Sequence, residues 1–499
     1  MTETEKRSSV PLSTWLFALA VVVGVFLRVL VAQSVGGRLD SDQAIVYLMA
    51  RHGGGGWLYW GQPYGGTLLQ LTAAGAFSVL GSSVLLLQIV EMLWWLVAAV
   101  LLRTLGARLW GVFAGNLAGA LLLLPGPVLL WLTVRDPGFY GPTVALGVAV
   151  LLLALITERL TPRLALALGV LAGLAVWTSP MGAAFVVPAG LYALLRKGTA
   201  RVTMLAGAVL GLVPLLIGTA RNTGAPASTE KVPLSELPTR AHQAVFDLLP
   251  AAWVGEVHTK AVLIGLAWCL LVVGAAAVGV VRRSWPLVVL AAVAALSVVV
   301  VSVGRTVVAP VSLRYAALLA PVLLLLVAGL ASRLGPARWA GWLLVLGLTG
   351  LTFAVSDRVT GGFRSAGGNH WAGEGGDLRR SGTDYARAGS TDLPALVAHL
   401  RSLGVTAVYA DYWVAYPIDA QSAEQIIAAP LVGSRWQPYV DRADNAARTT
   451  IVVFGGQGNE AAIRGNAALP PYQVSTVAGF TVFVFGGHVP SDQLPRGLY

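Results

Sequence analysis

Two aspartates, Asp40 and Asp42, stand out in the stretch LDSDQAIVYLMARH near the front of the chain. A charged side chain beside apolar segments is costly unless it is solvated or partnered, so carboxylates placed there suggest chemistry or ion handling. One of them can serve as a general base, and the Asp-Ser-Asp spacing also permits joint ligation of Mg²⁺ or Mn²⁺. The plainer interpretation is a helix cap, because Asp is favoured at that position.

The chain around these aspartates has the composition of a membrane protein. Of its 499 residues, 56% are hydrophobic and 11% are charged, and the mean hydropathy is +0.73. That leaves too little polar surface to cover a soluble globule of this size. Apolar runs that are long enough, or nearly so, to cross about 30 Å of hydrocarbon predict about eleven transmembrane helices. The runs cover residues 12–33, 83–102, 107–131, 139–157, 164–179, 182–195, 201–219, 261–281, 285–303, 310–330 and 337–355.

The basic residues predict an orientation. If the N-terminus is cytoplasmic, every predicted inner turn carries at least two Lys or Arg, as at Arg103/Arg108 and Arg282/Arg283. Asp40 and Asp42 then face outward, and an odd number of spans places everything after about residue 356 outside. We therefore expect a multi-pass protein of a bacterial plasma membrane with an extracytoplasmic C-terminal domain.

The chain divides into a transmembrane part and a small domain. We expect residues 1–356 to form the membrane body, with outer loops at about 34–82 and 220–260. Residues 357–390, rich in Gly, Ser and charge, read as a linker, and 391–499 as an α/β domain.

Within that C-terminal domain, a helix is predicted from Thr391 to Leu403, where Gly404 stops it. Strands are predicted at 406–413, 425–427, 449–454 and 480–485. The first of these ends in an aromatic and acidic cluster that suits sugar stacking and core packing about equally. The cluster consists of Tyr409, Asp411, Tyr412 and Trp413.

Several features exclude other classes. The net charge of +11 is dispersed over turns and loops instead of forming one patch, which predicts contact with lipid headgroups and no nucleic acid. The single cysteine, Cys269, lies in a predicted span, so no intramolecular disulfide is possible. The six histidines show no metal-ligand spacing.

Five motifs, read together, resemble the GT-C superfamily of membrane glycosyltransferases, in particular the branch with protein O-mannosyltransferases and the lipid A aminoarabinose transferase. They are DSDQAIVYLMARH (40–52), YWGQPYGGTL (59–68), WTSPMG (177–182), NTGAP (222–226) and LRYAALLAP (313–321). The resemblance covers roughly residues 12–355 and implies many spans, an acidic residue in the first outer loop and a polyprenyl- or dolichyl-phosphate sugar donor. The family usually has Asp-Glu where this chain has Asp42-Gln43, so a role for that glutamate is lost here, and Asp40 is positioned to compensate.

The resemblance also implies roles for residues. Asp42, with Asp40 as second candidate, would take the proton of an acceptor hydroxyl. Donor-phosphate binding is predicted for Arg314, Arg51, Arg135 and Arg221. Substrate contact is predicted for Gln62, Tyr64 and Tyr315. The expected reaction is an inverting transfer of a monosaccharide from a polyprenyl-phosphate donor to a cell-envelope glycan, lipid or protein acceptor, with a divalent cation as an optional cofactor.

Two other functions remain open. A transporter or flippase of a lipid-linked saccharide would place ionisable residues midway along spans, where Glu91 is the main candidate. A non-catalytic membrane scaffold would use the C-terminal domain to bind a partner. The other acidic residues gather at one face, which favours the enzyme.

Overall fold

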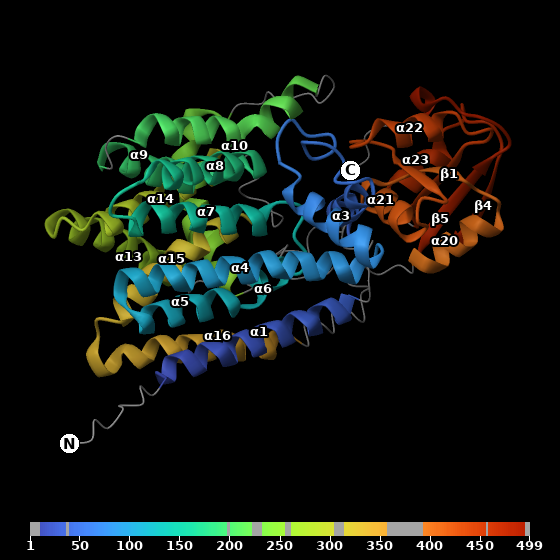
Figure 1. Ribbon diagram of the computed structural model, residues 1–499. Coiled ribbons are helices and arrows are strands. Elements are labelled where there is room, and N and C mark those ends of the chain that lie inside the picture. The colour runs from blue at the N-terminus through green and yellow to red at the C-terminus, as the bar shows by residue number, and fades with distance from the viewer. Residues whose placement is uncertain are drawn as a thin grey trace, which may run out of the picture.

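The computed structural model describes residues 10–35, 39–196, 200–221, 232–254, 261–303, 314–356, 393–455 and 458–494. Figure 1 shows a body of helices running side by side and a sheet domain beyond one end of them, next to α3 (Leu68–Leu80). We call residues 393–494 the C-terminal domain. The predicted fold class, a polytopic helical membrane protein with a small α/β domain, is confirmed. The predicted linker, 357–390, lies outside the described residues.

The helices of the body follow the predicted apolar runs. They are α1 (Leu12–Val35), α4 (Val84–Trp110), α5 (Val112–Leu123), α6 (Pro127–Leu132), α7 (Tyr140–Ile156), α8 (Pro162–Thr178), α9 (Ala183–Arg196), α10 (Arg201–Arg221), α13 (Ala261–Val281), α14 (Trp285–Val303), α15 (Ala316–Ala331) and α16 (Ala340–Ser356). Among the described helices, five are individually long and apolar enough to cross a membrane, namely α1, α4, α10, α13 and α14. The count of eleven spans therefore stays a prediction.

The outer surface of the body is apolar. Leu270 and Val281 of α13 are 73% and 82% exposed. Side chains of this kind need hydrocarbon around them, as in the lipid-facing surface of a helical membrane protein.

One predicted run, 107–131, does not form a single helix. The preceding helix α4 continues to Trp110, α5 ends at Leu123, and α6 begins only at Pro127. Pro125 cannot donate a helical hydrogen bond, and Gly126 has φ +101°, a left-handed conformation that breaks the helix.

Helices α8 and α10 pack closely against each other. Each helix carries a Gly-x-x-x-Gly pair, Gly169/Gly173 in α8 and Gly207/Gly211 in α10. A Cβ atom on Gly169 would lie 2.0 Å from the carbonyl oxygen of Met204, so only glycine lets the two backbones approach this closely.

Two loop regions carry helices of their own. The first loop, residues 39–83, contains α2 (Ser41–Arg51) and α3 (Leu68–Leu80). The second contains α11 (Leu237–Gln243), the π-helical turn η4 (Ala244–Leu248) and α12 (Leu249–Val254).

The C-terminal domain is a five-stranded sheet in the order β2-β1-β3-β5-β4. Strands β2, β1 and β3 are parallel, whereas β5 and β4 are antiparallel to their neighbours. Its elements are α20 (Leu393–Ser402), β1 (Ala407–Ala410), α21 (Tyr412–Gln421), β2 (Ile427–Pro430), α22 (Gln437–Asp444), β3 (Thr450–Phe454), α23 (Gly458–Gly465), β4 (Tyr472–Val477) and β5 (Phe480–Phe485).

The sequence mispredicted one boundary here that matters. The strand expected over 406–413 ends at Ala410, because Asp411 caps α21 by accepting a hydrogen bond from the Trp413 backbone N–H at 2.9 Å. Tyr412 therefore begins a helix. Strand β2 begins at Ile427, later than predicted, and β4 was not predicted at all.

Candidate active site

Asp40 and Asp42 stand at the start of α2 but play different parts. Asp40 is the N-cap: its Oδ1 accepts the backbone N–H of Gln43 at 2.9 Å. Asp42 lies in the first helical turn and has no capping task, so its carboxylate can face other groups. The plain interpretation, a helix cap, holds for Asp40.

Three distant parts of the chain meet at Asp42. Arg314, just before α15, donates from Nη1 to Asp42 Oδ2 at 3.1 Å. Tyr412, from the C-terminal domain, donates its hydroxyl to Asp42 Oδ1 at 2.9 Å. Tyr59 of the first loop donates to the Asp42 carbonyl oxygen at 2.9 Å. Asp42 and Arg314 each keep 22% of the side chain exposed, so water or a substrate can still reach the pair.

Asp42, Arg314 and Tyr59 line a cavity of about 620 Å³, whereas Tyr412 contacts Asp42 without being part of the lining. Its lining consists of Asp42, Tyr59, Gln62, Tyr64, Pro137, Phe139, Tyr140, Ser179, Pro180, Met181, Val299, Val300, Val303, Arg314, Tyr315 and Arg435. One wall is polar, whereas the wall from α14 is apolar. Val299 and Val303 on that wall are 51% and 53% exposed, so the cavity reaches the apolar surface of the body. A ligand with a charged head and an apolar tail suits this shape.

The tyrosines around Asp42 are hydrogen-bond donors at neutral pH. Burial raises the pKa of Tyr412 well above its usual value, and the charge of Asp42 raises it further. Burial and Asp42 act in the same way on the pKa of Tyr59. Both hydroxyls therefore keep their protons and hold Asp42 in place.

Arg135 pairs with Asp40 in a closed environment. Arg135 Nη2 lies 3.2 Å from Asp40 Oδ2, and the Arg135 side chain is 1% exposed. Arg135 Nε donates to Gln43 Oε1 at 2.8 Å, and Gln43 Nε2 lies 3.4 Å from Glu91 Oε2. Neither Asp40 nor Arg135 lines the cavity. Gln43 thus links the buried Arg135 to Glu91.

The predicted metal site at Asp40 and Asp42 stays a prediction. The two carboxylates turn to different guanidinium groups, Arg135 and Arg314, at ion-pair distance. Within the described part of the chain, no group of three or more His, Cys, Asp or Glu gathers as a metal site would require.

Of the remaining predicted site residues, three line the cavity and two do not. Gln62, Tyr64 and Tyr315, for which substrate contact is predicted, line the cavity. Arg51 does not; it lies 3.6 Å from Glu424 of the C-terminal domain. Arg221 is the exposed last residue of α10 and is not part of the lining either. Arg51, Arg135 and Arg221 thus lie outside the lining of this cavity, and their part in binding a donor phosphate stays a prediction.

The C-terminal domain docks on the first loop through aromatic side chains. Trp60 stacks on Trp436 with ring centroids 4.2 Å apart. Tyr416 and Tyr439 join the hydrophobic cluster formed around α2 and α3. His52 lies 2.8 Å from Glu424 at the edge of this contact. The docking carries Tyr412 to Asp42 and Arg435 to the cavity.

Sequence reasoning missed Tyr59 and Arg435 and did not connect Tyr412 to Asp42. Tyr59 begins the YWGQPYGGTL motif, so the signal existed. Tyr412 was noted only within an aromatic cluster. Arg435 lies in an irregular segment between β2 and α22, where no pattern marks it.

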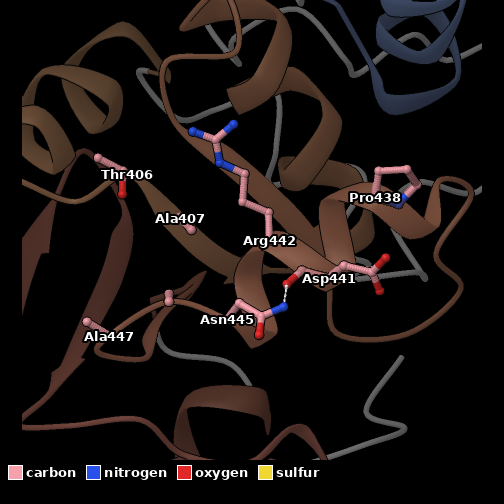
Figure 2. A pocket seen from close by; sticks show the side chains of 8 residues that line it. Thr406, Ala407, Pro438, Asp441, Arg442, Asn445 and Ala447 are labelled. Carbon is pink, nitrogen blue, oxygen red and sulfur yellow. Dashed lines mark hydrogen bonds between the residues drawn. The ribbon is translucent and has the colours of Figure 1, made fainter.

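A second cavity of about 550 Å³ lies within the C-terminal domain. Figure 2 shows its lining from α22 and the residues around β1, including Arg442 and Asp441. No residue of the Asp42 cavity takes part in it.

Comparison with known proteins gives a structural result. No family model and no curated protein matches the chain. Among solved structures, apo ArnT from Cupriavidus metallidurans matches with a TM-score of 0.59 and 14% identity over 98% of this chain and 100% of that chain. ArnT bound to undecaprenyl phosphate matches with a TM-score of 0.58 and 15% identity, over 95% and 98% of the two chains. An oligosaccharyltransferase from Archaeoglobus fulgidus has a TM-score of 0.49 and 13% identity, over 96% and 73%. The two ArnT structures confirm the expected resemblance at the level of the fold: this chain shares the fold of ArnT.

Proposed function

We propose that this protein is a membrane glycosyltransferase. It transfers a monosaccharide from a polyprenyl-phosphate donor to a hydroxyl group of a cell-envelope glycan, glycolipid or protein at the outer face of the membrane. The observation that carries this proposal is the Asp42–Arg314 pair in a cavity with one apolar wall. The ArnT-like fold supports it, because that protein is seen with undecaprenyl phosphate.

The cavity offers the three things that such a transfer needs. Asp42 accepts the proton of the attacking hydroxyl. Arg314 binds the donor phosphate through its guanidinium fork. The valines of α14 and Met181 receive the first part of the polyprenyl chain. The acceptor oxygen forms its bond to the sugar C1 while the bond from C1 to the phosphate oxygen breaks, and the electron pair leaves with the phosphate. A single displacement of this kind inverts the sugar.

Transport is the weaker alternative. Glu91, the acidic residue best placed for it, is fully buried beside Gln43 and does not line the Asp42 cavity. The charged groups that do line the cavity are Asp42, Arg314 and Arg435, at one end of the body.

The test is donor consumption by the full-length protein. Purified protein in nanodiscs is incubated with a panel of radiolabelled polyprenyl-phosphate sugars and an envelope extract as acceptor. We expect one donor to be converted to polyprenyl phosphate and a labelled acceptor. Asp42→Asn serves as the inactive control. If no donor is consumed, while wild type and Asp42→Asn carry labelled lipid across proteoliposomes equally well, the protein is a transporter.

A further inference from the structure

Arg435 faces the cavity without a carboxylate of its own. Its Nη1 lies 3.4 Å from the carbonyl oxygen of Gly61, and its guanidinium lies 5.9 Å from the ring centroid of Tyr412. Its Nε atom is buried without a hydrogen-bond partner. Among the described residues no acidic group forms an ion pair with it, whereas Arg314 pairs with Asp42. Arg435 is partly buried and forms no ion pair among the described residues, so its guanidinium can bind a further anion beside the Tyr412 hydroxyl and the nearby charge of Asp42 that already act on it.

The positive charges of Arg314 and Arg435 act on the same part of the cavity. Arg314 and Arg435 line the same cavity, from the body and from the C-terminal domain respectively. Burial raises the pKa of Tyr64 on the cavity wall, and the positive charges of Arg435 and Arg314 both oppose that rise. The two guanidinium groups are therefore both within electrostatic range of the Tyr64 hydroxyl.

This inference rests on the proposed sugar transfer. Arg314 alone supplies too little positive charge to stabilise the phosphate that leaves in that transfer. The donor phosphodiester carries one negative charge. As the bond from C1 to oxygen breaks, its electron pair adds a second charge to the departing phosphate, and the acceptor proton moves to Asp42. Before that proton arrives, Arg314 is already shared with Asp42. A further cation is needed where the charge grows, since electrostatic stabilisation of a developing anion is a large contribution to catalysis.

We infer that Arg435 of the C-terminal domain is this second cation and binds the phosphate of the polyprenyl donor and product together with Arg314. The active site is then complete only when the C-terminal domain is docked. The Trp60–Trp436 stack sits next to Arg435 in the chain, and the Arg435 backbone N–H donates to the Tyr416 hydroxyl at 2.5 Å. Docking therefore fixes the position of the guanidinium.

A substitution at Gly61 in the first loop would displace Arg435 of the C-terminal domain. Gly61 has φ +63°, and a Cβ atom there would lie 2.7 Å from the Arg435 Cα. Gly61→Ala therefore displaces Arg435 without removing its charge. Gly53 in the same loop has φ +71° and no heavy atom within 4 Å of such a Cβ, so Gly53→Ala is a control for backbone strain alone.

The experiment measures the Kd of undecaprenyl phosphate for full-length protein in phosphatidylcholine nanodiscs. Loss of a charge-assisted hydrogen bond predicts binding roughly tenfold to a hundredfold weaker in Arg435→Met. Arg435→Lys keeps the charge and should fall between Met and wild type. Gly61→Ala should also bind weakly, and Arg314→Gln is the positive control. Arg442→Gln removes an exposed guanidinium of the same domain, at the cavity of Figure 2, and should bind as wild type does.

The outcomes separate this inference from the proposed function. Wild-type affinity in Arg435→Met, with weakened binding in Arg314→Gln, overturns the role of Arg435 and leaves the glycosyltransferase proposal intact. Absence of binding by the wild type overturns both. A repeat with excess phosphatidylglycerol tests headgroup binding: if that lipid abolishes the difference between Arg435→Met and wild type, Arg435 serves ordinary anionic lipids and the inference fails.

Discussion

Asp40 and Asp42, only two positions apart in the first loop, form ion pairs that differ in their access to the cavity. Asp40 and Arg135 form a closed pair, with 13% and 1% of their side chains exposed. Asp42 and Arg314 form an open pair, with 22% of each exposed to a cavity. Both pairs contain the same chemical groups at similar distances, so charge alone does not distinguish them. The exposure of the side chains therefore decides which of the two ion pairs can contact a substrate.

The difference follows from the position of α2. Because the helix begins at Ser41, Asp40 is its cap and Asp42 a residue of its first turn. Asp40, just before the helix, pairs with Arg135, and Asp42, within the first turn, pairs with Arg314. Of the two aspartates, only Asp42 lines the cavity.

The largest expected effect comes from Asp42→Asn. Loss of an aligned general base lowers a rate by about 10²–10⁴-fold, so sugar transfer should nearly vanish while donor binding persists. The measurement is the initial rate of donor consumption beside the Kd of the donor. Asp441→Asn, an exposed change in the C-terminal domain, is the matched control. Near-normal transfer by Asp42→Asn would refute the assignment of the base.

Asp40→Ala should lower the stability of the fold, whereas Asp42→Asn lowers the rate of sugar transfer. It leaves the Arg135 guanidinium buried and unpaired, which costs about 3–5 kcal/mol when a buried ion pair is broken. We expect a lower thermal unfolding midpoint in detergent, with donor affinity preserved in the fraction that remains folded. Ser83→Ala removes an uncharged cap, from α4, and should cost only about 1 kcal/mol. If Asp40→Ala instead keeps full stability and loses turnover, the closed pair is the catalytic one.

A smaller effect is expected for Tyr412→Phe. The change removes one hydroxyl hydrogen bond to Asp42 and keeps the ring, so kcat should fall by about tenfold with KM for the donor little changed. Tyr409→Phe is a close control, because Tyr409 donates to Asp444 elsewhere in the same domain. Equal kinetics in the two variants would show that the C-terminal domain does not position Asp42.

Much of the fold could be predicted from the sequence. Apolar runs mark helices because hydrophobicity is a property of each segment, and α13 and α14 have the predicted bounds, 261–281 and 285–303. Strand β5 also has its predicted bounds, 480–485. The break between α5 and α6 was missed, because the apolar run continues through Pro125 and Gly126. The end of β1 was missed because Asp411 favours a helix start over a longer strand.

The sequence by itself determined that this is a membrane protein and that its first loop carries the acidic residues. It also marked Asp42, Arg314, Gln62, Tyr64 and Tyr315, which the cavity brings together. Only the tertiary structure decided which aspartate faces the cavity and which arginine meets it. The Arg314–Asp42 and Tyr412–Asp42 contacts join residues 272 and 370 positions apart. Local patterns cannot encode such pairs, because they arise only when the helices pack and the C-terminal domain docks on the first loop.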